Sequence, residues 1–198
     1  MEKQKIIAIS GSPRKNGNTE TLLDWTIESA VATGADVKKY NVCSIRFSPC
    51  KECGACSKTG ECIQDDDLRA ILPEFMAADK VIIATPVFFM NMPAQLKAFI
   101  DRFQCLWAKK VQLGQPLRGD SKRHTGYLIA AGGTKGQSLF NGLNQTIKCF
   151  YQIMDIEFDE ASSLYYWRID ENGAIARRDG AREEAAKLGE IIAATDML

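Results

Sequence analysis

The chain has 198 residues, of which 45% are hydrophobic and 25% charged, as in an ordinary one-domain globular protein. Basic and acidic residues number 25 each, so no basic tail or stripe predicts binding to nucleic acid or to a membrane. No signal or membrane-spanning segment is visible, which predicts a cytoplasmic protein. Its seven cysteines then indicate metal, cluster or redox use rather than disulfides. The single histidine, His124, excludes histidine-rich zinc sites, and we expect it to be a solvated residue where a strand begins.

The predicted elements alternate between strands and helices along the chain. Apolar or alternating runs closed by turn signals predict strands at residues 6–10, 36–42, 80–84, 125–131 and 156–164. Helical spacing and N-terminal signals predict helices at residues 18–33, 66–77, 93–107, 138–154 and 183–194. This order favours an α/β fold of the flavodoxin-like type, with a doubly wound parallel sheet of five strands in the order 2-1-3-4-5. We expect a single domain over residues 1–198.

A loop rich in glycine and hydroxyl groups joins the first strand to the first helix. Backbone N–H groups and the helix dipole at such a junction attract a phosphate. A nucleoside triphosphatase loop is disfavoured, because Gly11 and Gly17 have five residues between them and Asn18 stands where that loop needs lysine. The dinucleotide pattern G-x-G-x-x-G is also absent. The candidate phosphate-binding residues are Ser10, Ser12, Pro13, Arg14, Asn16, Gly17, Asn18 and Thr19.

This loop resembles the FMN phosphate loop of NADPH-dependent FMN reductases and related flavodoxin-like flavoproteins. The resemblance extends through Ala84-Thr85-Pro86-Val87 to Leu96-Lys97 and finishes with Asp101-Arg102, so that it covers most of residues 5–155. It implies that the chain is an FMN-dependent oxidoreductase. FMN would carry the chemistry, so we assign no protein side chain as catalytic acid or base.

Loops after the third and fourth strands meet the phosphate loop at the carboxyl edge of the predicted sheet, where doubly wound folds bind ligands. The first is apolar and aromatic, which suits the flat ring of a flavin, and the second has glycines that allow close backbone approach. The candidate ring-binding residues are Thr85, Pro86, Val87, Phe88, Phe89 and Asn91 in the first loop and Ala131, Gly132, Gly133 and Gly136 in the second.

The segment 43–64 has no helical or strand period and is interpreted as a structured, cysteine-rich loop inserted after the second strand. It contains the motif Cys50-x2-Cys53-x2-Cys56-x5-Cys62. Three cysteines at this spacing can bind three corners of a [4Fe–4S] cluster and a fourth can complete it. A structural zinc site and free or redox-active thiols are the alternatives.

The same motif in a flavodoxin-like chain resembles that of the iron–sulfur flavoproteins of anaerobic microbes. In that family the four cysteines hold a [4Fe–4S] cluster beside FMN. The resemblance implies that a ferredoxin-like donor, or NAD(P)H, passes electrons through the cluster and FMN to a small acceptor such as O2, H2O2 or a quinone. It also implies a homodimer or homotetramer, which the aromatic-rich predicted helix favours.

Three other functions stay open at this point. The chain could be a cluster-free NAD(P)H-dependent FMN or quinone reductase, or a redox-sensing or zinc-binding module that uses the fold without chemistry. It could also be a non-enzymatic electron carrier like flavodoxin, although flavodoxins are usually strongly acidic and this chain is neutral. The cysteines outside the motif are expected to be small buried apolar residues; they are Cys43, Cys105 and Cys149.

Overall fold

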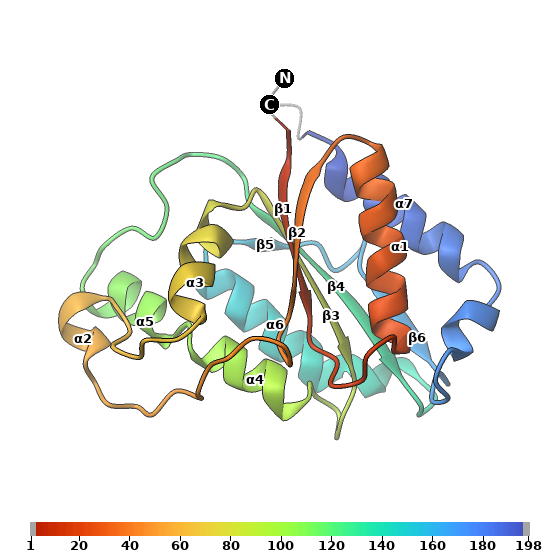
Figure 1. The fold of residues 1–198 in the computed structure, drawn as a ribbon, viewed down its shortest axis with the longest axis horizontal. Coiled ribbons are helices and arrows are strands. Elements are labelled where there is room, and N and C mark those ends of the chain that lie inside the picture. The colour runs from red at the N-terminus through yellow and green to blue at the C-terminus, as the bar shows by residue number, and fades with distance from the viewer. Residues whose placement is uncertain (1–2, 196–198) are drawn as a thin grey trace.

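The computed structural model of the chain describes residues 3–195, and residues 1–2 and 196–198 of the predicted domain lie outside this part. A central sheet separates two layers of helices (Figure 1). The strands are β1 (Lys5–Ser10), β2 (Asp36–Asn41), β3 (Lys80–Pro86), β4 (Thr125–Gly132), β5 (Glu157–Phe158) and β6 (Leu164–Trp167).

The α-helices vary from one turn to four turns in length. They are α1 (Asn18–Ala32), α2 (Cys56–Thr59), α3 (Leu68–Ala77), α4 (Ala94–Asp101), α5 (Gln104–Trp107), α6 (Asn141–Ile153) and α7 (Ala181–Ala193). A π-helical turn at Ala108–Gln112 and two 3-10 turns at Gln137–Phe140 and Ala174–Arg177 complete the list. Among the described residues, none of these helices has both the length and the apolar character needed to cross a membrane.

The sheet is parallel throughout. Its strands lie in the order β2-β1-β3-β4, and both β5 and β6 pair with β4 on its far side. β3 and β4 are buried along almost their whole length, as expected for strands covered on both faces. The predicted α/β fold with a doubly wound parallel sheet is confirmed.

Each face of the sheet has its own apolar core, because successive side chains in a strand point to opposite faces. In β1, Ile7 and Ile9 pack on the side of α3, α4 and α6, whereas Ile6 and Ala8 pack on the side of α1 and α7. Complete burial of an isoleucine contributes about 1.5–3 kcal/mol. The two cores thus fix β1, β3 and β4 with their carboxyl ends at one edge, from which the loops of the candidate site leave.

The prediction of one continuous strand at residues 156–164 is wrong. β5 and β6 pair with opposite ends of β4, and the chain between them leaves the sheet as a turn. The Asp159 side chain accepts a hydrogen bond from the Ser162 N–H at 3.0 Å, and the Ser163 hydroxyl donates to the Asp159 carbonyl at 2.7 Å. Aspartate and serine favour such local turns over a strand. The Ser163 hydroxyl also accepts the Leu128 N–H at 2.9 Å, which replaces the lost ladder bond.

The helix predicted at residues 93–107 is divided into α4 and α5. At the break, the N–H groups of Arg102 and Phe103 bond to the carbonyls of Phe99 and Ile100, three residues back, at 3.1 and 3.0 Å. Such bonds tighten the last turn of a helix. The apolar spacing continues across the break, which is why the sequence did not indicate it.

The prediction that His124 is solvated is also wrong. The His124 side chain is 4% exposed. Its Nδ1 lies 2.8 Å from the carbonyl oxygen of Ala78, and its Nε2 lies 3.0 Å from a carboxylate oxygen of Asp120. A buried polar ring needs such partners. This histidine therefore holds the turn that precedes β4 at the amino edge of the sheet, away from the loops of the candidate site.

Candidate functional site

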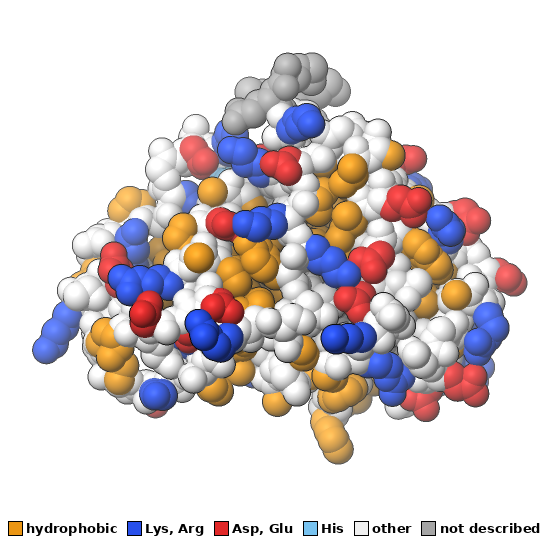
Figure 2. Space-filling model, in the orientation of Figure 1, with side chains coloured by type: hydrophobic (Ala, Val, Ile, Leu, Met, Phe, Trp, Pro, Cys, Tyr) orange, Lys and Arg blue, Asp and Glu red, His pale blue; other side chains and the backbone are white. Residues whose placement is uncertain are grey.

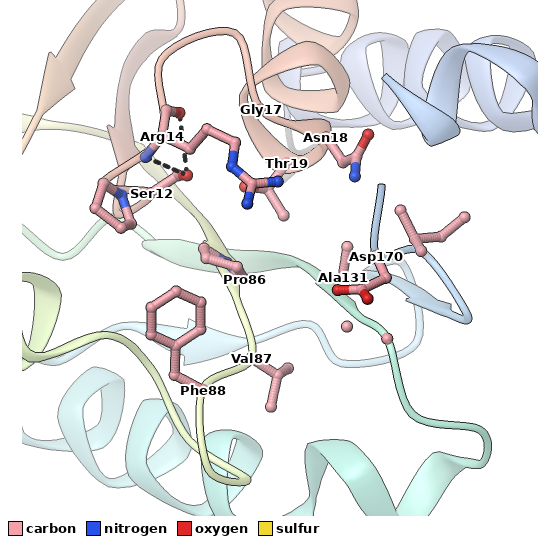
Figure 3. Close-up of a pocket in the computed structure, with 14 residues that line it drawn as sticks. Ser12, Arg14, Gly17, Asn18, Thr19, Pro86, Val87, Phe88, Ala131 and Asp170 are labelled. Atoms are coloured by element: carbon pink, nitrogen blue, oxygen red, sulfur yellow. Dashed lines mark hydrogen bonds between the residues drawn. The ribbon is translucent and has the colours of Figure 1, made fainter. Parts of the chain in front are cut away.

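A cavity of about 400 Å³ opens at the carboxyl edge of the sheet, where the loops after β1, β3 and β4 meet (Figure 3). Twelve of the predicted site residues line it. They are Ser12, Pro13, Arg14, Gly17, Asn18, Thr19, Pro86, Val87, Phe88, Ala131, Gly132 and Gly133. The wall is completed by Ile169 and Asp170, which follow β6 in the chain. The sequence did not indicate these two residues.

The loop between β1 and α1 is held in shape by its own side chains. The Ser12 hydroxyl accepts the Arg14 N–H at 3.1 Å and donates to the Arg14 carbonyl at 3.2 Å (Figure 3). The Glu20 carboxylate, from the first turn of α1, reaches back and accepts the Asn16 N–H at 2.7 Å. Asn16 has a φ of +53°, a conformation that asparagine tolerates better than most residues. The loop is therefore preorganised.

The amino end of α1 opens into the cavity. Gly17 precedes the helix and supplies no side-chain cap, and Asn18 and Thr19 begin it and line the cavity. The first N–H groups of a helix have no partner within the helix and carry the positive end of its dipole. The Arg14 side chain extends toward Thr19 in Figure 3. An anion of the size of a phosphate fits the chemistry of this corner.

The side chain of Asn18 bonds to the chain that follows β6. Its Nδ2 donates to the Glu171 carbonyl at 2.8 Å, and its Oδ1 accepts the Ile175 N–H at 3.1 Å. These bonds tie the chain that follows β6 to the start of α1. They bring Ile169 and Asp170 to the cavity from a segment about 150 residues away, a distance over which no local sequence signal acts.

The opposite side of the cavity is formed by the loops after β3 and β4. Pro86, Val87 and Phe88 lie together on one side in Figure 3, facing the phosphate loop across the cavity. A Cβ atom on Gly133 would lie 3.2 Å from the Asp170 side chain, tighter than ordinary contact. On Gly132 it would lie 2.7 Å from Leu139. Glycine at these positions therefore lets the backbone of the β4 loop form the cavity wall.

Six predicted residues do not line the cavity. Ser10 and Thr85 are buried beneath the loops, and the Asn91 side chain donates to the Thr146 hydroxyl at 3.2 Å. Asn16 and Gly136 lie on the loops but outside the cavity wall. The remaining residue, Phe89, points away into solvent and is fully exposed.

Phe89 and Met90 form the tip of a tight turn between β3 and α4. The Phe88 N–H bonds to the Asn91 carbonyl at 2.7 Å, and the Asn91 N–H bonds to the Phe88 carbonyl at 3.0 Å. Both tip residues have positive φ, +50° and +64°, which bulky side chains adopt only at a cost of about 1–3 kcal/mol each. Figure 2 shows this turn as an apolar projection at the lower edge of the molecule. A strained, exposed apolar turn beside a cavity is typical of a functional surface.

A second hollow, of about 380 Å³, lies at the cysteine-rich segment. The segment 43–64 contains the one-turn helix α2, which was predicted only as loop. All four motif cysteines line this hollow: Cys50, Cys53, Cys56 and Cys62. Within residues 3–195, the structure gathers no group of three or more cysteine, histidine, aspartate or glutamate side chains in a geometry that could hold a metal ion. Burial and the nearness of the other three thiols raise the pKa of the Cys56 thiol.

The three other cysteines differ from one another. Cys105 of α5 is buried as predicted and lines the same hollow, and burial, with the nearby motif thiols, raises its pKa to about 11. The prediction of burial is wrong for Cys43 and Cys149, which are exposed. Cys43 lies in a turn two residues after the end of β2, and its N–H bonds to the Asn41 side chain at 2.9 Å. Cys149 lies on the outward side of α6.

Comparison with known proteins decides the family. The sequence pattern of the NADPH-dependent FMN reductase family matches residues 4–156. The iron–sulfur flavoprotein of Methanosarcina thermophila is 36% identical over 152 residues, which cover 77% of this chain and 73% of that protein. The chain belongs to the iron–sulfur flavoprotein and NADPH-dependent FMN reductase family. It is therefore an FMN-dependent oxidoreductase, with FMN as its cofactor.

Other similarities agree with this family. An iron–sulfur flavoprotein of Archaeoglobus fulgidus is 40% identical over 98 residues, which are 50% of this chain and 44% of that protein, so this match spans less than half of the relative. Among solved structures, an NAD(P)H:quinone oxidoreductase from Methanothermobacter marburgensis has a TM-score of 0.76 over all of both chains, at 12% identity. This last similarity shows the shared fold.

In this flavoprotein, the stability that Glu20 gives to the loop between β1 and α1 is expected to depend on pH. Burial by itself raises the pKa of the Glu20 carboxyl, but hydrogen bonds from Lys39 and the Asn16 N–H outweigh it, so the pKa lies below its ordinary value of 4.5. The stabilisation is thus complete above pH 4.5 and is lost as the pH falls through the lower, folded-state pKa.

Changing Glu20→Ala is expected to lower the free energy of unfolding of the cofactor-free protein by about 1 kcal/mol near neutral pH, because the loop N–H loses its acceptor. Urea unfolding of both proteins at a series of pH values measures this difference. It should shrink below pH 4.5. A difference that stays constant into acid would contradict the role of the carboxylate.

Proposed function

We propose that this flavoprotein takes electrons from a ferredoxin-like donor or NAD(P)H and passes them through a [4Fe–4S] cluster and FMN to a small acceptor such as O2, H2O2 or a quinone. When bound, FMN supplies the redox chemistry, and the cluster supplies a one-electron inlet. The observation that carries the proposal is the cavity at the carboxyl edge. In it, an uncapped helix start and an apolar turn face each other from loops far apart in sequence.

The two sides of this cavity divide the binding of FMN between them. The N–H groups at the start of α1 and the Arg14 guanidinium would hold the phosphate, because they present positive charge on a preorganised loop. Pro86, Val87 and Phe88 would pack on the ring and exclude water from one side of it. The Gly132 and Gly133 backbone would approach the ring from the β4 loop.

Cys50, Cys53, Cys56 and Cys62 are proposed to hold the cluster. Four thiols that line one hollow form the donor set that iron–sulfur clusters take. Their loop would close further when it binds the cluster, because ligand-bearing loops become ordered with their metal. The donor set therefore fits the group.

We also propose that the chain works as a homodimer or homotetramer. The cysteine hollow and the flavin cavity share no lining residue, and in Figure 1 α2 lies at the left edge of the molecule, whereas α1 lies to the right of β1 and β2. Electrons from the cluster would then enter the FMN of a second copy. The exposed turn at Phe89 and Met90 gives this assembly an apolar contact beside the cavity.

Analysis of oxygen-free protein tests the proposal. Protein purified under anaerobic conditions is expected to contain FMN together with iron and sulfide, and to show broad absorbance beyond the flavin bands. Reduction by ferredoxin or NAD(P)H followed by steady turnover of an acceptor would separate the enzyme from a pure electron carrier. Yellow protein with FMN but no iron would instead favour a cluster-free FMN or quinone reductase.

A further inference from the structure

Arg102 lies at the break between α4 and α5 and has a buried guanidinium group. Its side chain is 1% exposed. Its Nη1 donates to the Ser48 carbonyl at 2.8 Å and to the Asp66 carboxylate at 2.5 Å, and its Nη2 donates to the other Asp66 oxygen at 3.2 Å. This is the two-pronged geometry in which arginine binds a carboxylate most strongly. The arginine thereby ties Ser48, within the cysteine-rich segment, and Asp66, just after it, to the core.

The same guanidinium also contacts the cysteine motif itself. Nη2 donates to the Sγ of Cys62 at 3.4 Å, and Arg102 lines the hollow that the four motif cysteines share. A buried charge is costly unless it is paired, and here one carboxylate, one carbonyl and one sulfur share it. The guanidinium therefore contacts one of the proposed cluster ligands directly, in addition to its bonds to Ser48 and Asp66.

We propose that Arg102 is a positioning residue of the metal centre, which orients Cys62 and raises the reduction potential of the cluster through its N–H···S bond. The inference rests on the proposed function, because it requires the cluster. Reduction adds one electron from the donor to the cluster and makes it more negative, and a hydrogen bond or positive charge at a ligand sulfur stabilises this form. Asp66 offsets part of the arginine charge.

Asp66 gives the proposal a test of opposite sign. Removing the N–H···S bond in Arg102→Met should shift the cluster potential to a more negative value. Asp66→Asn should shift it to a more positive value, because the arginine loses its counter-charge but keeps its place next to Cys62. Loss of either charge shifts the potential in these directions by electrostatics alone, so Arg102→Lys, which keeps the charge but not the fork to Asp66 and Cys62, isolates the N–H···S bond. A purely structural role for Arg102 predicts no shift in the lysine variant.

The experiment measures the midpoint potential of the cluster by redox titration of anaerobic, FMN-loaded protein, followed by electron paramagnetic resonance. The matched control is Arg118→Met. Arg118 is a half-buried arginine whose guanidinium lies 3.4 Å from the Ala78 carbonyl and 3.1 Å from His124, and it lines neither the cysteine hollow nor the flavin cavity. This control should leave the potential unchanged.

Loss of folding in Arg102→Met would be detected by loss of FMN binding. In that case Arg102→Lys carries the test, because lysine keeps the charge but cannot bond to Asp66 and Cys62 as a fork. The cluster potential of Arg102→Lys should lie between the wild-type value and that of Arg102→Met. If Arg102→Met does not fold, the potential of Arg102→Lys should still lie below the wild-type value. A wild-type protein without iron would refute the proposed function. If the wild-type protein holds a cluster and neither Arg102→Lys nor Asp66→Asn changes its potential from the wild-type value, the inference alone is refuted.

Discussion

Thr19→Asp is expected to weaken FMN binding by roughly 100-fold or more, which is about 2.8 kcal/mol. Thr19 is 2% exposed and lines the cavity in the first turn of α1. An aspartate there would place a second negative charge beside the phosphate of FMN and would occupy the helix N–H groups that the phosphate needs. Quenching of FMN fluorescence on titration with cofactor-free protein measures the change.

Two controls separate this effect from damage to the fold. Riboflavin carries the same ring but no phosphate, so its affinity should change much less in the same variant. Thr21→Asp puts the same charge in the same turn, at a residue that does not line the cavity and whose hydroxyl bonds to the Gly17 carbonyl at 3.1 Å. An equal loss for FMN and riboflavin would contradict the placement of the phosphate at α1.

The second large effect is expected at the cysteine motif. Cys56→Ala should remove most of the iron and sulfide, by at least roughly tenfold, while FMN stays bound at the level of the wild type, because a [4Fe–4S] cluster is held by four thiolates. Cys56 lines only the cysteine hollow and not the flavin cavity. Colorimetric iron and sulfide analysis, with flavin released by heating, measures both groups in one sample.

Cys149→Ala is the matched control. Cys149 is exposed on α6 and lies outside the cysteine hollow, so the loss of its thiol should leave the iron content unchanged. Equal iron in the two variants would mean that the motif does not hold the metal. Equal loss of FMN and iron in Cys56→Ala would mean instead that the substitution unfolds the chain.

The architecture and the cavity-lining loop between β1 and α1 could be predicted from sequence because their causes are local. A short apolar run such as Ile6–Ile9 forms a buried strand wherever a sheet is covered on both faces. A loop such as residues 10–19, between a strand and a helix, presents N–H groups whatever lies elsewhere in the chain. Twelve predicted residues therefore meet in one cavity, although they come from three loops.

The structure departs from the sequence predictions where the direction of a side chain or a distant partner decides. Phe89 does not line the cavity, because the two-residue turn after β3 points it into solvent. Strand 156–164 divides because Asp159 and Ser163 bond locally, while Ser163 also completes the ladder of β4. Cys149 is not buried because Leu143, Ile147, Phe150 and Tyr151 form the core face of α6, and Cys149 lies off this face.

The sequence by itself determined most of the elements and their order, since these depend on local spacing and composition. It also contained the residue types that a phosphate, a flat ring and a four-thiolate cluster would require. Only the tertiary structure decided that Asn18 brings Asp170 to the cavity at the carboxyl edge and that Arg102 meets Cys62. Both depend on single side-chain bonds between segments far apart in the chain. Such bonds form only after the two cores have packed and fixed the distance between their partners.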